Sequence, residues 1–324
     1  MHKWLALPAA SESVALSIAA GMAMAGGKPI VLVQSSGFAN MASGLSSLIQ
    51  PYGIKFPIIT SWRTYEAGDS EIQHAVLAEN LPDFIQACGF DYELIPQENE
   101  EEAVTYVMES FNDQYILVLQ ADTFSKVSLL EEHKTSRDSY VARGEFLNEL
   151  NKHFGGNSGT TFIGTTGATS REMATLMPDT KNFYMAGNMG NALSVGVGAW
   201  MQGRDVIVLG GDAESLMHLG GLATAARITK EYTPSHSLTY VVMNNESNFT
   251  TGGQVSPASF LDLVEIFEGF VPNVVHAFTP DDLISALEEV DSGQFQVIVV
   301  ECGFDPVYPR PSAEAIINSV NSFK

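Results

Sequence analysis

The sequence predicts an α/β protein made of two consecutive doubly wound parallel sheets. Its length of 324 residues is above the usual size of one domain, so two domains of about 150 residues each are expected. Short β-rich runs alternate with helix-length segments from one end of the chain to the other. Runs such as 206–209 are apolar without alternation, which is typical of parallel strands covered by helices on both faces.

The strand-like runs fall into two groups with a segment that lacks one between them. The first group is 29–34, 56–62, 92–95 and 115–120. The second group is 161–164, 183–186, 205–210, 238–244, 273–278 and 295–301. Residues 128–158 are charged and then Gly-rich, which predicts a helical or loop-like connection. We therefore predict a first domain over 1–127, a linker over 128–157 and a second domain over 158–324.

Composition places the chain among globular proteins and makes nucleic acid a poor candidate partner. Hydrophobic residues make up 45% and charged residues 17%, which gives enough apolar area to offset the entropy of ordering the chain. The formal net charge is −22 with only 16 Lys and Arg, whereas phosphate-backbone binding depends on basic residues that displace counterions. A small anionic ligand would need a local device, such as a helix N-terminus, a bound cation or one well-placed Arg.

Cysteine usage and the apolar runs predict a cytoplasmic protein without a membrane partner. Cys88 and Cys302 lie far apart and form no metal-ligand spacing, so we interpret both as reduced core thiols. The apolar run 14–25 imitates a signal peptide, but Pro8 and several polar residues separate it from Lys3. No window approaches the roughly 18 uninterrupted apolar residues of a membrane-spanning helix.

Polar residues at two successive strand ends form the most informative pattern. One buried run ends in Gly210, Gly211 and Asp212, and the next ends in Asn244 and Asn245. Ligands collect at the carboxyl ends of strands in an open α/β sheet, so these side chains are expected to converge on one crevice. Carboxylate and amide oxygens suit Mg²⁺, which usually takes one or two carboxylates together with substrate phosphates.

A helix expected to begin near Glu214 would add its N-terminal dipole and N–H groups to a bound diphosphate. The alternative interpretation is that Asp212 only caps this helix and that Asn244 and Asn245 form a turn.

The paired pattern resembles the thiamine-diphosphate fingerprint, which runs Gly-Asp-Gly, a spacer, then Asn-Asn. Two departures stand out: the third position is Ala213, and the spacer 214–243 is slightly long at 30 residues. Further segments are similar to phosphonopyruvate decarboxylases and sulfopyruvate decarboxylases. They are QSSGFAN at 34–40, SWR at 61–63, Glu71, Gln73, His74, TFSK at 123–126, GATSRE at 167–172, FYMAGNMG at 183–190 and TGGQ at 251–254.

The resemblance implies a cofactor site built from both domains, with 1–127 as the pyrimidine-binding domain and 158–324 as the diphosphate-binding domain. Glu12 would contact N1′ of the aminopyrimidine ring of the cofactor, and a raised pKa in an apolar pocket would let it share a proton there. Without the resemblance, Glu12 is a first-turn carboxylate after an N-capping Ser11. The carbonyl of Gly187 would accept a hydrogen bond from the 4′-amino group, and Met189 would hold the cofactor bent unless it is an ordinary core methionine.

By the same resemblance, Mg²⁺ would be bound by Asp212, Asn245 and the backbone carbonyl of Ser247. The full set of residues implied around the cofactor is Gly187, Asn188, Met189, Gly211, Asp212, Ala213, Glu214, Asn245, Ser247 and Asn248. Because family members place the glutamate of one subunit against the diphosphate site of another, a homodimer is the smallest assembly expected to be active.

The chain departs from phosphonopyruvate decarboxylases at two positions assigned to the catalytic set. Asn191 and Asn248 stand where those enzymes tend to carry histidines. Asn forms hydrogen bonds but cannot change its charge near pH 7, so the substrate or the later steps are expected to differ.

An anionic substrate tail would be bound by Arg63 or Arg171, since a planar guanidinium matches a carboxylate or phosphonate; the alternative is that both form structural salt bridges. Weaker substrate candidates are Ser36, Gln73, His74 and Lys126.

The predicted function is decarboxylation of a short, anionic 2-oxo acid to an aldehyde, with thiamine diphosphate and Mg²⁺ as cofactors. One alternative is a carboligase of the acyloin or acetolactate type, which joins the fragment left after loss of CO₂ to a second carbonyl compound. The other is a catalytically degenerate subunit that keeps only the fold and an assembly surface. Pocket shape decides the substrate, and residue order does not fix pocket shape.

Overall fold

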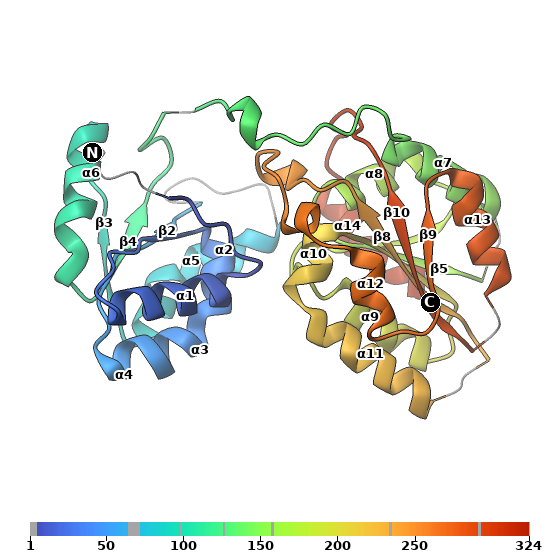
Figure 1. Ribbon diagram of the computed structural model, residues 1–324, viewed down its shortest axis with the longest axis horizontal. Helices are drawn as coiled ribbons and strands as arrows, with labels where there is room; N and C mark the ends of the chain where they lie inside the picture. The colour runs from blue at the N-terminus through green and yellow to red at the C-terminus, as the bar shows by residue number, and fades with distance from the viewer. Residues whose placement is uncertain are drawn as a thin grey trace. The chain divides into compact units, whose positions relative to one another are not determined.

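The computed structural model describes residues 5–63, 72–97, 99–125, 127–156, 159–232, 235–290 and 293–323. The chain divides into two compact units, Met1–Ser128 and Leu129–Lys324. Each unit is an α/β fold around one sheet in which all strands are parallel, and Figure 1 shows helices on both sides of each sheet. The predicted fold class is therefore confirmed.

The first unit contains a four-stranded sheet with the order β1-β2-β4-β3. Its strands are β1 (Val31–Val33), β2 (Ile58–Ser61), β3 (Asp91–Leu94) and β4 (Tyr115–Leu119). Its helices are α1 (Glu12–Met24), α2 (Ser35–Phe38), η1 (Ala39–Met41), α3 (Ala42–Gly44), η2 (Leu45–Ile49), α4 (Gln50–Tyr52), α5 (Ile72–Ala87), α6 (Glu100–Glu109) and η3 (Ser110–Asn112).

The two faces of the first sheet form separate cores because side chains alternate along each strand. On β2, Ile58 packs with Leu16 of α1 and Leu81 of α5, whereas its neighbour Ile59 packs on the opposite face with Val107 of α6. A doubly wound sheet buried on both faces needs apolar residues at successive positions, which is the pattern that the sequence displays.

The second unit contains a six-stranded sheet with the order β6-β5-β7-β8-β10-β9. Its strands are β5 (Thr161–Gly164), β6 (Lys181–Tyr184), β7 (Val206–Gly211), β8 (Leu238–Asn244), β9 (Val274–Ala277) and β10 (Phe295–Glu301). Its helices are η4 (Glu131–His133), α7 (Arg143–Phe154), α8 (Ala168–Leu176), α9 (Ala192–Met201), α10 (Asp212–Met217), α11 (Leu219–Glu231), η5 (Phe249–Thr251), η6 (Pro257–Phe260), α12 (Leu263–Glu268), α13 (Pro280–Glu289), α14 (Ala313–Asn318) and η7 (Ser319–Phe323).

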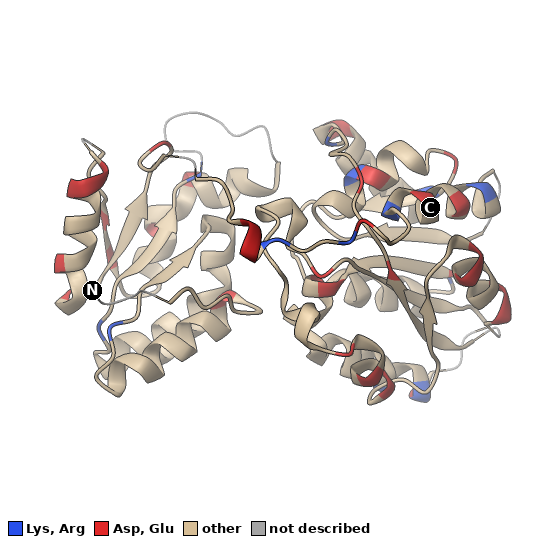
Figure 2. Cartoon of the chain, turned by 45° about the horizontal axis from the view of Figure 1, so that its top comes forward, with Lys and Arg blue, Asp and Glu red and all other residues tan. Residues whose placement is uncertain are grey.

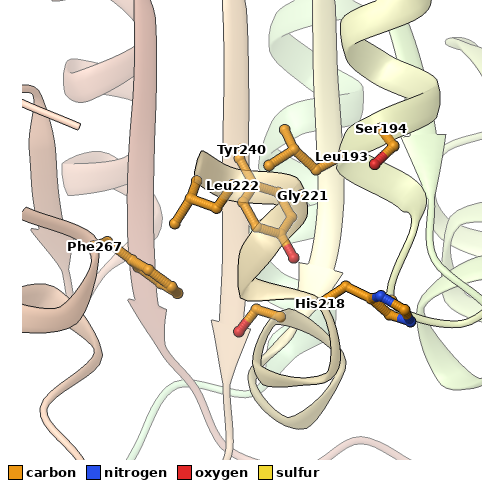
Figure 3. A pocket seen from close by; sticks show the side chains of 9 residues that line it. Leu193, Ser194, His218, Gly221, Leu222, Tyr240 and Phe267 are labelled. Atoms are coloured by element: carbon orange, nitrogen blue, oxygen red, sulfur yellow. The ribbon is translucent and has the colours of Figure 1, made fainter. Parts of the chain in front are cut away.

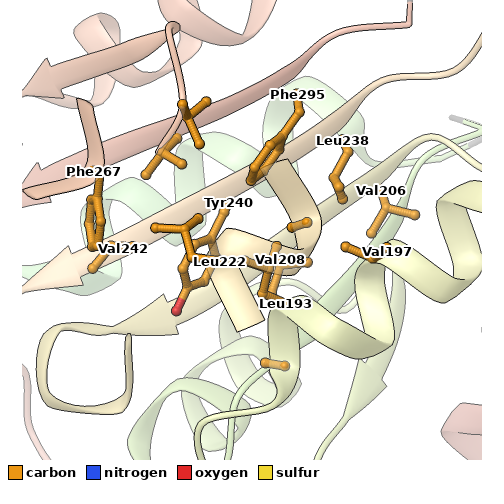
Figure 4. Packing of buried hydrophobic residues seen from close by; sticks show 14 of the residues in the cluster. Leu193, Val197, Val206, Val208, Leu222, Leu238, Tyr240, Val242, Phe267 and Phe295 are labelled. Carbon is orange, nitrogen blue, oxygen red and sulfur yellow. The ribbon is translucent and has the colours of Figure 1, made fainter. Parts of the chain in front are cut away.

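One face of the second sheet packs against α9, α11 and α12, and the other packs against α7, α8 and α13. Figure 4 shows the first of these cores, where Leu193 and Val197 of α9 and Leu222 of α11 lie against Val208 and Tyr240 of the strands. On the other face, Phe146, Leu147 and Leu150 of α7 are fully buried.

The expected linker was 128–157; all of it except Ser128 falls within the second unit, and α7 contributes to the core of that unit. The linker residues contain no strand among those that are described. The assignment of pyrimidine-binding and diphosphate-binding roles to the two units stays a prediction.

Acidic residues outnumber basic ones by 38 to 16, and Figure 2 shows them spread over helices of both units. Cys88 and Cys302 are both buried and free, as two core thiols should be. Across the described ranges, no helix has the length and apolar character needed to span a bilayer.

Candidate active site

The order of strands in the second sheet makes the connections diverge at the carboxyl ends of β5 and β7. From β5 the chain crosses to β6 on one side, and from β7 it crosses to β8 on the other side. Ligands of open α/β sheets bind where the connections diverge in this way. The residues directly after these two strands are Thr165 and Asp212, and the Thr165 N–H donates to the carbonyl of Leu209 on β7 at 2.9 Å.

Asp212 is a buried carboxylate that is held in place by hydrogen bonds. Only 4% of the residue is exposed, and its Oδ1 accepts the Ala213 N–H at 2.7 Å. Its Oδ2 accepts the hydroxyl of Ser256 at 2.8 Å, and the backbone N–H of Glu246 is also directed at it. Burial raises the pKa of the Asp212 carboxyl, and these hydrogen bonds offset the rise only in part.

The loop after β8 lies directly beside Asp212. Asn245 is buried, and its Oδ1 accepts the Ser247 N–H at 3.0 Å. Ser256, which binds Asp212, also donates its backbone N–H to the carbonyl of Glu246 at 2.8 Å. The structure therefore brings Asp212 together with residues 245–247, although they are more than 30 positions apart in the chain.

These groups fit a hard divalent cation. A carboxylate, an amide oxygen and a backbone carbonyl are all oxygen donors, which Mg²⁺ prefers, and a diphosphate would complete its shell. Within the described part of the chain, no group of three or more His, Cys, Asp or Glu side chains could hold a metal. The oxygen donors of Asp212, Asn245 and Ser247 are of the kind that Mg²⁺ prefers, and their assignment as its ligands stays a prediction.

The helix after β7 differs from the expectation in its start and its length. It begins at Asp212 rather than near Glu214, with Gly211 at the N-cap, and it ends after six residues at Met217. Asp212 is thus the first helical residue and not the cap, so that part of the alternative interpretation was wrong. Its other part, a turn at Asn244 and Asn245, is compatible with the bond from the Ser247 N–H to Asn245 Oδ1. A helix this short contributes little dipole to a bound anion.

Glu214 belongs to a buried polar pair beneath this turn. The Tyr240 hydroxyl donates to Glu214 Oε2 at 2.9 Å, and burial raises the pKa of both side chains. A Cβ on Gly210 would lie 2.6 Å from the Tyr240 ring and hydroxyl, so the close packing of this pair requires glycine there.

The loop after β6 presents the expected cofactor-facing residues to solvent. Met189 is 38% exposed, so it is not a core methionine. Asn188 has a left-handed backbone with φ of 57°, and its Oδ1 accepts the Asn191 Nδ2 at 3.0 Å. Gly190 also has a positive φ, and the ring of His218 lies 2.3 Å from where its Cβ would be.

Asn248 opens a hairpin that brings the chain back to Ser256. Its N–H donates to the carbonyl of Gln254 at 2.7 Å, and its own carbonyl accepts the Gly253 N–H at 3.0 Å. Ser247 and Val255 pair as an isolated antiparallel bridge. The segment TGGQ at 251–254 therefore forms the tip and return of this hairpin.

Glu12 lies at the start of α1 in the first unit, where it contacts the segment QSSGFAN. It is half-buried, and its Oε2 accepts the Asn40 Nδ2 at 3.0 Å. A Cβ on Gly37 would lie 2.3 Å from Glu12 Oε1, so the carboxylate occupies space that only glycine leaves open. Ser11 sits at the N-cap without a side-chain capping bond.

Comparisons with known proteins identify relatives of this chain and a family model that matches part of the second unit. Residues 163–301 match the family model described as thiamine pyrophosphate enzyme, C-terminal TPP binding domain. Phosphonopyruvate decarboxylase of Streptomyces viridochromogenes is 30% identical over 305 residues, which cover 87% of this chain and 74% of that protein. The chain belongs to the thiamine pyrophosphate enzyme family.

Two further relatives are sulfopyruvate decarboxylases. That of Methanosarcina acetivorans is 25% identical over 281 residues, covering 79% of this chain and 70% of that protein. Sulfopyruvate decarboxylase subunit beta of Methanothermobacter thermautotrophicus is 34% identical over 154 residues, covering 44% of this chain and 80% of that subunit. The members of the thiamine pyrophosphate enzyme family that resemble this chain are thus named decarboxylases.

The predicted substrate residues of this thiamine pyrophosphate enzyme belong to both units. Ser36 follows β1, Arg63 follows β2, and Gln73 and His74 lie in the first turn of α5. The Ser36 hydroxyl donates to Gln34 at 2.9 Å, and His74 is buried. Lys126 lies outside the described residues.

Arg171 belongs to the second unit, on α8. The next residue, Glu172, is a buried carboxylate whose Oε1 accepts a hydrogen bond from Arg143 at 2.5 Å. Arg143 therefore pairs with this glutamate, and the roles assigned to Arg63 and Arg171 stay predictions.

A small pocket, with a cavity volume of only about 10 Å³, lies between α9, α10 and α11. Figure 3 shows Leu193, Leu222, Tyr240 and His218 around it, and Gly190 connects it with the loop after β6. None of the predicted substrate residues lines this pocket.

Four polar residues of the site region were missed by sequence reasoning. They are Arg137, Tyr240, Ser256 and Glu301. Glu301 carried a usable signal, because it ends the apolar run of β10 just as Asp212 and Asn244 follow theirs. Nothing in the local sequence of Ser256 or Arg137 distinguishes them from loop residues.

Proposed function

We propose that this protein is a thiamine-diphosphate- and Mg²⁺-dependent decarboxylase that converts a short, anionic 2-oxo acid to CO₂ and an aldehyde. The observation that carries the proposal is the meeting of Asp212 with the loop 245–247 at the strand ends of a matched thiamine pyrophosphate-binding domain. The relatives of highest coverage are named for phosphonopyruvate and sulfopyruvate, both 2-oxo acids with a second anionic group.

Different residues of the chain would bind the cofactor, transfer a proton and bind the substrate. When bound, thiamine diphosphate supplies an electron sink, which accepts the electron pair of the carbon–carbon bond that breaks as CO₂ departs. Asp212, Asn245 and the Ser247 carbonyl would hold Mg²⁺ and with it the diphosphate. Glu12, oriented by Asn40, would hold a proton at N1′ of the aminopyrimidine. Arg63 or Arg171 would bind the anionic tail of the substrate.

We further propose that the active form is a homodimer with Glu12 of one copy serving the cofactor of the other. Support comes from α1, which exposes an apolar stripe to solvent. Leu16, Ala19 and Ala20 are buried in the core, yet Val14, Ile18 and Met22 on another side are 40–50% exposed. Their spacing of four residues forms one stripe along the helix, and an exposed apolar stripe of this kind is typical of an interaction surface. A second copy that presents the same stripe would cover it.

Carboligation is the second candidate. Asn191 and Asn248 occupy the positions of expected histidines. The Asn191 side chain donates to Asn188 Oδ1, whereas Asn248 forms its hydrogen bonds through its backbone. A site without a titrating side chain at these positions lacks a proton donor there for completing aldehyde release.

The test measures CO₂ release from phosphonopyruvate, sulfopyruvate, pyruvate and longer 2-oxo acids with thiamine diphosphate and Mg²⁺. We expect release from a dianionic or longer acid, and a loss of about 10²–10⁴-fold in Glu12→Gln because a proton-transferring group is removed. Glu79→Gln, an exposed residue of α5, is the matched control and should retain full activity.

Cofactor binding without CO₂ release from any acid would contradict the proposal. If CO₂ is released but a new carbon–carbon product accumulates when an aldehyde acceptor is added, carboligation replaces decarboxylation as the function.

A further inference from the structure

A buried arginine joins two carboxylates next to the loop 245–247. Arg137 precedes α7, and only 3% of its side chain is exposed. Its Nη2 lies 2.5 Å from Glu246 and its Nη1 lies 2.6 Å from Glu301. The ring of Tyr140 stacks against the guanidinium, with 4.3 Å between its centroid and the guanidinium carbon. One guanidinium therefore bridges two acidic groups from different elements.

The two carboxylates are attached to the two strand ends beside the proposed metal site. Glu246 lies in the loop itself, between Asn245 and Ser247. Glu301 is the last residue of β10, and its Oε1 accepts the Asn244 Nδ2 at 2.9 Å and lies 3.0 Å from His276 Nε2. Burial opposes ionisation of Glu301, but its hydrogen bonds with Asn244, Arg137 and His276 leave its pKa below the ordinary value. Arg137 thus connects the end of β10 to the loop that follows β8.

The backbone of Glu246 needs such support. Its φ is 55°, a left-handed conformation that side chains other than glycine and asparagine rarely adopt. Its carbonyl accepts the Thr135 hydroxyl at 2.9 Å as well as the Ser256 N–H at 2.8 Å. Residues 133–137 also run beside the hairpin, where Lys134 pairs with Gln254 as an antiparallel bridge. The side chain and the carbonyl of Glu246 are therefore held by the same short segment, Thr135 to Arg137.

The charges of the cluster favour a cation nearby. One guanidinium faces two carboxylates, so acidic groups outnumber the arginine in this cluster. Buried charges interact over short range with less screening than surface charges. The excess negative charge lies beside the donors that would hold Mg²⁺.

We propose that Arg137 is a positioning residue that, through Glu246, fixes the loop 245–247 in the geometry that binds the divalent cation. This inference rests on the proposed function, because it assumes that Asn245 and Ser247 bind Mg²⁺ with the diphosphate. Partners of this kind behind metal ligands set the orientation of the ligands and hence the affinity.

The test compares Arg137→Lys and Glu246→Gln with the wild-type protein. Arg137→Lys keeps the positive charge but cannot bridge both carboxylates as the guanidinium does. Glu246→Gln removes the ion pair with Arg137 at a side chain that is 31% exposed. The matched control is Arg227→Lys, because Arg227 pairs with Glu231 on the surface of α11 at 77% exposure. Binding of thiamine diphosphate is followed by calorimetry as Mg²⁺ is titrated, and the melting temperature is measured without either ligand.

We expect both variants to need about 10–100-fold more Mg²⁺ for half-maximal cofactor binding, whereas Arg227→Lys binds like the wild type. We also expect the ligand-free Glu246→Gln protein to melt near the wild-type temperature, since its carboxylate is partly exposed. An unchanged Mg²⁺ requirement in Glu246→Gln and in folded Arg137→Lys would overturn the inference, whatever their melting temperatures. If the wild type shows no Mg²⁺-dependent cofactor binding, the proposed function itself fails, and the inference fails with it.

Discussion

Gly37 illustrates how a single missing side chain shapes the candidate site. The segment QSSGFAN that contains it is similar to decarboxylase sequences, but the local sequence gives no physical reason for a glycine at this position. In the structure, Glu12 Oε1 occupies the place of its absent Cβ, at 2.3 Å. The nearest atom is the end of a flexible side chain, so an added methyl group would move the carboxylate before it disturbed the fold.

Gly37→Ala is therefore predicted to lower CO₂ release while the protein stays folded. A displacement of the Glu12 carboxylate by about 1 Å should cost about 10²-fold in turnover. Gly198→Ala is the control, because nothing lies within 4 Å of its added Cβ on α9, and alanine should stabilise that helix by about 0.5–1 kcal/mol. Turnover and melting temperature are measured for both. Wild-type turnover in Gly37→Ala would argue against a catalytic position for Glu12.

At the scale of elements, every predicted strand is present, and the boundaries differ only slightly. The run 161–164 matches β5, and the run 295–301 matches β10. The run 183–186 is shifted, since β6 spans Lys181–Tyr184. Its first residues are polar, and a sheet-edge strand needs less apolar sequence than a central one. The local pattern therefore predicts that a strand exists better than it predicts where the strand ends.

The hairpin 247–255 depends on glycine backbone geometry. Gly253 has a φ of 82°, and its nearest potential contact is Leu129 at 4.0 Å, so space is available but the conformation is unusual. We predict that Gly253→Ala lowers the free energy of unfolding by about 1–2 kcal/mol, the cost of left-handed backbone at a residue with a Cβ. Gly253→Asn should cost less, because asparagine visits this region more readily.

Denaturant unfolding of the wild type, Gly253→Asn and Gly253→Ala measures the free energy of unfolding. The Mg²⁺ concentration needed for cofactor binding should rise in that order. Equal stability of Gly253→Ala and the wild type would mean that the hairpin does not need this backbone geometry.

At the scale of the whole molecule, the apolar stripe on α1 is exposed to solvent in a single copy, and the proposed dimer would bury it. Ile18 is 50% exposed at the centre of the stripe, between Val14 and Met22. We predict that Ile18→Glu converts the proposed dimer to a monomer, because a charge would be buried at the proposed interface without a partner. The monomer should also lose CO₂ release, since Glu12 of a second copy would be absent.

Analytical ultracentrifugation measures the assembly. Ile317→Glu on α14 introduces the same change at a residue that is 61% exposed outside the stripe, and it should leave the dimer intact. A dimer that persists in Ile18→Glu would remove α1 as the interface.

The C-terminal residues show what long-range packing adds to the second unit. Phe323 of η7 contacts Phe183 of β6 with 5.2 Å between ring centroids, and Ser319 accepts the Tyr184 N–H at 3.2 Å. Arg204 donates to the carbonyl of Phe323 at 2.6 Å. The segment thereby covers the edge strand β6, which would otherwise present unpaired backbone groups. Nothing in its sequence indicated that role.

The sequence by itself determined the α/β class, the strands and the residues of the Asp212 and Asn245 motif, because continuous apolar runs and strand-end polar residues are local patterns. Only the tertiary structure decided the strand order, the bridge from Arg137 to Glu246 and Glu301, and the contact of Glu12 with Gly37. These depend on which distant segments pack together. Pairing between residues more than 100 positions apart, as for Arg137 and Glu246, leaves no periodic trace in the chain, since it is set by the global packing of the sheet and not by neighbouring residues.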